Sequence, residues 1–226
     1  MKTTLKIVLI LMIGLTFAMT TGCATNSGLR ASGFLKDYSK LGKDPDDFAK
    51  RVYIGKDVAF GAYDKVIVDH VTLFLAEDAE YKGIDPVELT ELAQYFHNAV
   101  IEALSGAYSF TDKPGPGTLR VRIAITDLVP NKPVSGSITS IVPVGLAASH
   151  LKKAGTGTHI GMGRAAFEAE ALDSQTNEVL AAVSDSQTGK KYRVTKSFTT
   201  WGQSKEIFNG WAQHFRKRLD KLSGRH

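Results

Sequence analysis

Residues 85–106 read DPVELTELAQYFHNAVIEALSG, and they contain a start signal, an apolar stripe and a stop signal for one helix. Asp85 is an N-cap residue, Pro86 suits the first helical position, and the Glu88 carboxylate can bond back to the backbone. Apolar side chains recur every three or four residues, at Leu89, Leu92, Ala93, Phe96, Ala99, Val100, Ala103 and Leu104. This pattern predicts an amphipathic helix that begins at Pro86 and ends at Ser105 and Gly106.

The C-terminal end has the same periodicity and predicts a second amphipathic helix from about Ser204. Its apolar residues at helical spacing are Ile207, Phe208, Trp211, Phe215, Leu219 and Leu222. Its final turns are rich in cations, namely Arg216, Lys217, Arg218 and Lys221. Because cations complement the dipole at a helix C-terminus, we expect them to be solvated, with lipid phosphate or peptidoglycan as the alternative partner.

Several strands are predicted outside these two helices. Lys65 to Leu75 is rich in β-branched and aromatic residues and predicts a largely buried strand. From Leu119 to Thr126, apolar residues alternate with Arg120, Arg122, Ala124 and Thr126, which is typical of a half-buried strand. Ala165 to Ala171, a turn at residues 173–177 and the apolar run Val179 to Val183 predict a hairpin.

Two helices with strands grouped between them predict an α+β fold. We expect two layers, a mostly antiparallel sheet with both amphipathic helices packed on one face. The strand Leu119 to Ile125 should lie antiparallel beside Ala165 to Ala171, so that Arg120 and Arg122 face Glu168 and Glu170 on the open side. These charges are expected to pair across the sheet, and an ionic binding strip is the alternative.

Composition excludes several classes of protein. The 226 residues are 43% hydrophobic and 23% charged, as in one folded domain rather than a disordered or collagen-like chain. A single cysteine excludes an intramolecular disulfide and a cysteine-rich metal site. The net charge of +5 mixes 28 basic with 23 acidic residues, so no polyanion-binding face is demanded and we expect no nucleic-acid partner.

The N-terminal segment predicts export and lipidation. Lys2 and Lys6 precede an apolar run from Ile7 to Met19, which is too short to span a bilayer, and small residues lead to Cys23. Thr-Thr-Gly-Cys resembles the bacterial lipobox, in which the cysteine thiol receives a diacylglycerol and the peptide is cut before that cysteine. Thr20 stands where leucine is usual, and an ordinary secreted protein is the alternative. By the same resemblance, Ala24 after the cysteine implies the outer membrane.

These observations divide the chain into three parts. Residues 1–22 are predicted to be a lipoprotein signal peptide, and residues 63–226 a single α+β domain. Residues 23–62 contain many glycines and hold no helical or strand period, which predicts a lipidated tether with an N-terminal docking segment. Its expected docking residues are Phe34, Leu35 and Tyr38.

No linear motif indicates catalysis. The phosphate-loop, hydrolase-elbow and HExxH motifs are absent from the sequence. His150 and His159 flank the glycine-rich residues 155–158 and could hold a metal or an anion, although a mobile loop is the better explanation. Asp69 and His70 resemble an acid/base pair, but neighbouring strand residues point to opposite faces, so we expect one exposed and one packed residue.

Residues 134–151, VSGSITSIVPVGLAASHL, carry no Asp, Glu, Lys or Arg. Core packing, an oligomer interface and a segment lying at the membrane all remain open. We expect a projection or surface patch used for self-association or membrane contact. Its possible interface residues are Ile138, Ile141, Val142, Val144, Leu146 and Leu151.

Five short motifs in order carry a family resemblance: GFLKDYS at 33–39, YKGIDP at 81–86, PGPG at 114–117, VPVG at 142–145 and LDSQT at 172–176. Together they resemble an uncharacterised bacterial lipoprotein family, domain of unknown function 3313. The resemblance implies a lipidated envelope protein and assigns no activity or catalytic residue. The order of elements is also similar, at the level of fold, to ring-forming outer-membrane lipoproteins of the curli-secretion and surface-exclusion types.

The sequence therefore predicts a lipid-anchored outer-membrane lipoprotein on the periplasmic side, with a non-catalytic role in the cell envelope. The covalent lipid on Cys23 would join it to the membrane, and no catalytic, cofactor-binding or metal-binding residue is expected. A homo-oligomer or an envelope protein is a possible partner. The alternatives are a subunit of an oligomeric envelope assembly or transport accessory, and a hydrolase acting on an envelope polymer.

Overall fold

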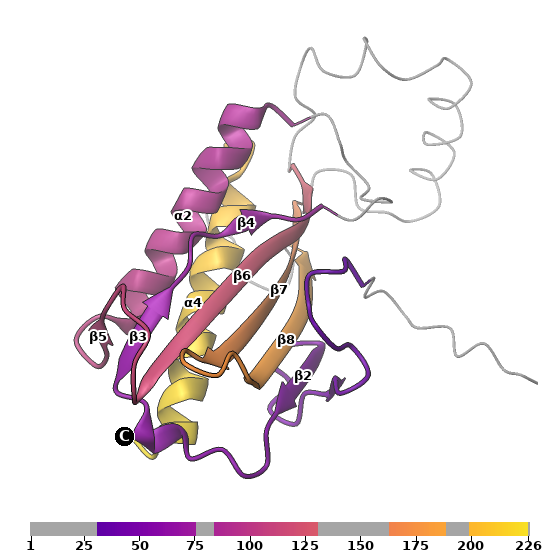
Figure 1. Cartoon of the computed structure of the whole chain (residues 1–226). Coiled ribbons are helices and arrows are strands. Elements are labelled where there is room, and N and C mark those ends of the chain that lie inside the picture. Colours follow the sequence, from indigo (N-terminus) through magenta and orange to yellow (C-terminus); the bar gives the residue numbers. More distant parts are fainter. Residues whose placement is uncertain (1–30, 76–83, 131–162, 189–198, 226) are drawn as a thin grey trace, which may run out of the picture.

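The computed structural model describes residues 31–75, 84–130, 163–188 and 199–225. These residues form an α+β structure in which helices α2 (Pro86–Leu104) and α4 (Gly202–Ser223) pack against each other on one face of a sheet (Figure 1). The predicted fold class is confirmed. No helix in the described ranges combines the length and apolarity needed to cross a bilayer.

The sheet has eight strands within the described residues, in the order β1-β2-β8-β7-β6-β3-β5, with β4 also paired to β6. Their bounds are β1 Gly42–Lys43, β2 Arg51–Ile54, β3 Lys65–Val68, β4 Thr72–Leu73, β5 Ser109–Phe110, β6 Thr118–Val129, β7 Arg164–Asp173 and β8 Val179–Thr188. The neighbouring strands β1-β2-β8-β7-β6 are all antiparallel to one another in turn. In contrast, β3 and β4 run parallel to β6, and β5 runs parallel to β3. The β7–β8 hairpin and the β6–β7 pairing are confirmed.

Both predicted helices form where their patterns begin and end. The Asp85 side chain accepts a hydrogen bond from the Val87 N–H at 2.7 Å, and Ser105 caps the other end of α2. The expected role of Glu88 differs, because its carboxylate accepts a hydrogen bond from the Trp201 indole at 3.0 Å. Glu88 therefore joins the N-terminal turn of α2 to the residue that precedes α4.

The main core lies between the two helices and the sheet. Phe96 of α2 stacks on Phe208 of α4, with ring centroids 4.6 Å apart. Trp211 of α4 packs on Phe167 of β7 at 4.3 Å, and its indole N–H donates to the buried Asp185 carboxylate at 2.7 Å. Large aromatic side chains thus hold this part of α4 away from the strands beneath it.

The prediction of one buried strand from Lys65 to Leu75 is wrong. The segment is divided into β3 and β4, and residues 69–71 between them are outside the ladder. Only Val66 and Val71 are buried in it, whereas Leu73 and Phe74 are exposed. The segment pairs with β6 toward one end of the sheet. A central strand is covered on both of its faces, whereas this segment is not.

Part of the predicted tether is in the sheet. The antiparallel ladder of β2 with β8 places Val52 opposite Val183, and β1 extends the sheet by one further strand. The sheet therefore starts before residue 63, where the single domain was expected to begin. Leu35 is 4% exposed and packs with Leu41 and Ala182 on the sheet face opposite the helices, with Phe34 and Tyr38 beside them.

Candidate functional site

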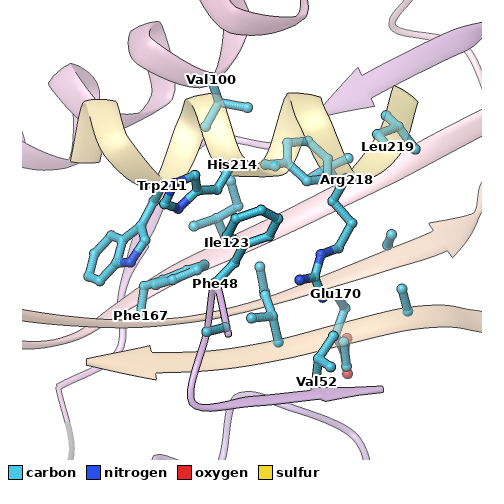
Figure 2. Close-up of a pocket in the computed structure, with 18 of the residues that line it drawn as sticks. Phe48, Val52, Val100, Ile123, Phe167, Glu170, Trp211, His214, Arg218 and Leu219 are labelled. Atoms are coloured by element: carbon cyan, nitrogen blue, oxygen red, sulfur yellow. The ribbon is translucent and has the colours of Figure 1, made fainter. Parts of the chain in front are cut away.

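A narrow cavity of about 110 Å³ lies between α4 and the sheet (Figure 2). Residues from β2, β6, β7 and β8 form its floor, and one side of α4 from Trp211 to Leu222 forms its roof. Nearly all the lining side chains are apolar. The polar members are Glu170, which is 2% exposed and pairs with Arg122 at 3.0 Å, and the only partly buried His214 and Arg218. The arrangement is that of a hydrophobic binding pocket that reaches the surface beside His214 and Arg218.

Small side chains leave this space open. Ala169, Ala171 and Ala181 line the floor, and Ala171 lies directly opposite Ala181 in the β7–β8 ladder. The cavity of about 110 Å³ is open to the surface, so its apolar lining remains in contact with water. An occupant of matching shape would bury that apolar surface, so the cavity is the strongest candidate for a ligand site.

Residues 44–49, here called the rim loop, form one side of the cavity entrance. Phe48 in this loop stacks on His214 of α4, with ring centroids 4.7 Å apart. The Arg218 guanidinium lies over the Phe48 ring, 5.4 Å from its centroid. Figure 2 shows these three side chains between α4 and the strand that carries Val52. The aromatic ring therefore covers part of the entrance.

Asp44 holds the rim loop in this position. Asp44 is 2% exposed, and its carboxylate accepts hydrogen bonds from the Phe48 N–H at 3.0 Å and the Ala49 N–H at 2.8 Å. The Arg218 guanidinium donates to both carboxylate oxygens, at 2.7 and 2.8 Å. Asp44 thus links the loop to α4 through charge-assisted hydrogen bonds.

The environment of Asp44 favours its charged form. Burial opposes ionisation, but the hydrogen bonds from Arg218 and from the Ala49 and Asp46 N–H groups outweigh burial and lower the pKa of Asp44 below its usual 3.8. A lowered pKa in the folded state stabilises the fold fully above the unfolded pKa, and that stabilisation is lost as the pH falls through the folded pKa.

We therefore expect the stability difference between the wild type and Asp44→Asn to be largest above pH 4 and to shrink as the pH decreases below 3.8. Urea unfolding of both proteins between pH 3 and 6 measures it. Taking the difference removes the contribution of the other carboxylates. A difference that is constant over this range would contradict the assignment.

The opposite face of the sheet has a second polar arrangement, in which two buried glutamates bind residues 32–38, here called the strap. Glu168 accepts hydrogen bonds from the Ser32 hydroxyl and the Tyr38 hydroxyl, each at 2.6 Å. Glu170 accepts from the Lys36 N–H at 2.7 Å. Both glutamates are at most 2% exposed, so the strap covers the face that was expected to be open.

The predicted charge pairing across β6 and β7 is half right. Arg122 lies directly opposite Glu170 and forms an ion pair with it at 3.0 Å, as predicted. Arg120 lies opposite Leu172 and forms its ion pair with Asp69 at 2.9 Å, so the prediction that it pairs with one of the two glutamates is wrong. The strap hydroxyl groups satisfy Glu168, and β3 brings Asp69 to Arg120 from the other side.

Asp69 and His70 have different neighbours, which agrees with the expectation that they form no acid/base pair. Asp69 binds Arg120, whereas the exposed His70 stacks on His97 of α2 with ring centroids 5.0 Å apart. Burial, and then the nearby His70, lower the pKa of His97. The two imidazoles therefore form a contact between α2 and the segment that follows β3.

The basic end of α4 is paired rather than simply solvated. Besides the Arg218 contact with Asp44, Arg216 pairs with Asp220 at 2.6 Å and Lys221 pairs with Asp46 at 2.8 Å. Three of the four cations that might have met an anionic partner thus have partners in the chain. The expectation of solvated cations is corrected for these three residues. The tertiary fold brings the rim loop to Arg218 and Lys221, whereas Arg216 pairs with Asp220 one turn later in α4.

The chain matches one protein family over most of its length. The model of the family described as "Protein of unknown function (DUF3313)" matches residues 30–215. The chain belongs to this family. No curated protein matches the chain. The family match begins just before the strap and includes the cavity floor, and it ends at residue 215, before Arg218 at the cavity entrance.

Solved structures with some likeness to this DUF3313 domain come from several bacteria. The PelC dodecamer structure from Paraburkholderia phytofirmans is 12% identical, with 78% of this chain and 96% of that chain covered and a TM-score of 0.36. Protein XCC0632 from Xanthomonas campestris is also 12% identical, with 76% and 91% covered and a TM-score of 0.36. The hypothetical protein CT253 from Chlamydia trachomatis is 8% identical, with 71% and 93% covered and a TM-score of 0.33.

Several predicted sites of the DUF3313 chain lie outside the described residues. These are Cys23, His150, His159 and the possible interface residues of segment 134–151. Within the described residues, no three His, Cys, Asp or Glu side chains are grouped so that they could hold a metal ion. The lipidation site and the interface remain predictions.

Asp44 and the strap contacts of Glu168 were not predicted from the sequence. Asp44 precedes Pro45 and accepts hydrogen bonds from N–H groups two to five residues later, so an Asx-turn signal was present in a segment that was interpreted as a tether. Glu168 and Glu170 were identified as an outward-facing pair, but the residues that cover them lie about 130 positions earlier in the chain. No local pattern could reveal that contact.

Proposed function

We propose that this DUF3313 protein is a lipid-anchored protein of the outer membrane, facing the periplasm, whose domain acts by binding rather than by catalysis. The observation that carries the proposal is the strap. The chain that leads from the predicted lipidated Cys23 is hydrogen-bonded to Glu168 and Glu170, two buried residues of the central strand β7. An anchor at Cys23 would then be nine residues from a segment that is bound to the centre of the fold.

The length of chain before the strap limits the distance between the domain and the membrane. Ser32 lies nine residues after Cys23, and a fully extended chain of that length spans at most about 30 Å. The face of the sheet that carries the strap is then kept near the lipid headgroups. The lipobox-like Thr-Thr-Gly-Cys motif supports the anchor, and Ala24 supports transport to the outer membrane.

The cavity beneath α4 supports binding over catalysis. Its lining is aliphatic and aromatic apart from His214 and Arg218 at the entrance and Glu170, whose carboxylate is already bound to Arg122 and to the strap. Catalysis on an envelope polymer would need polar groups that converge on a substrate. A binding role is also compatible with an oligomeric envelope assembly, for which the candidate contact residues are those of segment 134–151.

Mass spectrometry of the mature protein tests the anchor. We expect the chain to begin at Cys23 with a diacylglyceryl thioether and an acylated amine, and to fractionate with the outer membrane. Cys23→Ser should abolish both the modification and the membrane association, because one cysteine supplies the only thiol of the chain. An unmodified thiol, or a serine variant that still remains with the membrane, would overturn the proposal.

A further inference from the structure

We propose that the cavity between α4 and the sheet binds one unbranched hydrocarbon chain, the acyl chain of a fatty acid or phospholipid. This inference goes further than the proposed function and rests on it in one respect, since the anchor would keep the domain beside a supply of lipid. The binding itself depends only on the cavity.

The shape of the cavity favours a chain over a ring. Its roof extends from Trp211 to Leu222, which is about 16 Å along α4 at 1.5 Å per residue. The cavity, which is partly open to the surface, nevertheless has a volume of only about 110 Å³. A space that is long and of small volume is narrow, and an unbranched chain fills such a space better than a compact ring system does.

The chemistry of the lining excludes a polar occupant from the interior. Ala169, Ala171 and Ala181 lie below, and Phe215 and Leu219 lie above, so a water molecule or a polar group inside would have few hydrogen-bond partners. Methylene groups need no such partners and would bury apolar surface on entering. The floor of alanines is what leaves room for them.

The entrance places the polar head of such a ligand in water. Phe48, His214 and Arg218 are partly exposed and border the opening (Figure 2). The Arg218 guanidinium already binds both oxygens of Asp44. Head-group recognition is therefore weak, and the hydrocarbon chain carries the affinity, so fatty acids and phospholipids share the same determinant.

Tryptophan quenching by brominated lipid tests the proposal. The chain has two tryptophans, of which Trp211 lines the cavity and Trp201 does not. Residues 23–226 with Cys23→Ser and Trp201→Phe keep every described segment and leave Trp211 as the only reporter. We expect 9,10-dibromostearic acid to quench its fluorescence saturably, and unbrominated stearic acid to reverse the quenching. Vesicles of dibromo-phosphatidylcholine form a second arm that distinguishes a phospholipid from a free fatty acid.

Filling the cavity should block binding. Ala171→Leu should weaken the apparent affinity at least tenfold without lowering the melting temperature, because the added carbons occupy the empty space. Ala181→Leu is the second variant if Ala171→Leu is poorly folded. Ala107→Leu, at an alanine that packs against the same core outside the cavity, should bind as the parent does.

Absent or non-saturable quenching in both lipid arms would overturn the proposal, as would equal quenching in the cavity-filled variants. Because the tested chain carries no Cys23 thiol, these outcomes are independent of whether the native protein is lipidated. Lipid binding without lipidation would leave the cavity assignment intact and overturn the anchor alone.

Discussion

We expect Asp44→Ala to lower the free energy of unfolding by about 3–5 kcal/mol, because it leaves a largely buried guanidinium without its partner. The Asp44 side chain is 0% exposed and that of Arg218 is 14% exposed. The substitution also removes the acceptor for the Phe48 and Ala49 N–H groups, so the rim loop loses its attachment to α4. Urea denaturation measures the change.

A double-mutant cycle separates the ion pair from the loop contacts. Asp44→Ala combined with Arg218→Met should cost less than the sum of the two single changes by roughly 1–3 kcal/mol, because the second change removes the stranded charge. Lys221→Ala is the matched control, since the Lys221 side chain is 67% exposed and its pairing with Asp46 should contribute about 1 kcal/mol or less. Strict additivity in the Asp44 cycle would contradict the assigned contact.

Asp44→Ala should also change access to the cavity. Phe48 stacks on His214 only while the rim loop stays against α4, and Asp44 provides that attachment. Entry and release of an apolar probe should therefore become faster in Asp44→Ala at temperatures where the variant is still folded. Stopped-flow fluorescence of Trp211 measures both rates.

The second large effect is expected at the strap. Replacing Glu168 and Glu170 together by alanine should lower the free energy of unfolding by roughly 3–5 kcal/mol, because several hydrogen bonds to buried carboxylates are lost at once. We also expect faster tryptic cleavage after Lys36 and Lys40, as the strap leaves the sheet while the core remains folded. Glu178→Ala, at an exposed residue of the neighbouring turn, is the control.

Two further cycles resolve the partners of these glutamates. Glu170 should couple to Arg122, with which it forms an ion pair at 3.0 Å. Glu168 should couple to Tyr38 and show no coupling to Arg120, whose guanidinium is bound to Asp69. Coupling between Glu168 and Arg120, or a cleavage rate that the double substitution does not change, would contradict the strap arrangement.

In the native protein, release of the strap should also alter how the domain is held at the membrane. With the strap bound, the nine residues from Cys23 to Ser32 set the maximum reach. With it released, the free chain would extend past Lys40. Crosslinking of the domain to lipid headgroups in intact cells should decrease in the double glutamate variant, while the lipid modification at Cys23 is kept.

The elements that could be predicted from sequence are those with strong local signals. Asp85 and Pro86 begin α2 because the cap and the fixed backbone of proline act within one turn. The alternation on β6 and β7 predicted their antiparallel pairing, and the turn after Asp173 predicted the hairpin. The prediction of one buried strand from Lys65 to Leu75 was wrong, because β-branched composition cannot distinguish a strand that is covered on both faces from one that is not.

The two amphipathic helices, the β7–β8 hairpin and the α+β class follow from local patterns, because periodicity, caps and turns act over a few residues. Only the tertiary structure decided that Arg120 binds Asp69, that the strap covers Glu168, and that Asp44 joins the rim loop to α4. The cavity also belongs to the tertiary structure, since it exists where the alanines of two strands lie opposite one side of α4. These contacts join residues far apart in the chain, and they depend on which surfaces become buried together rather than on any local preference of the backbone.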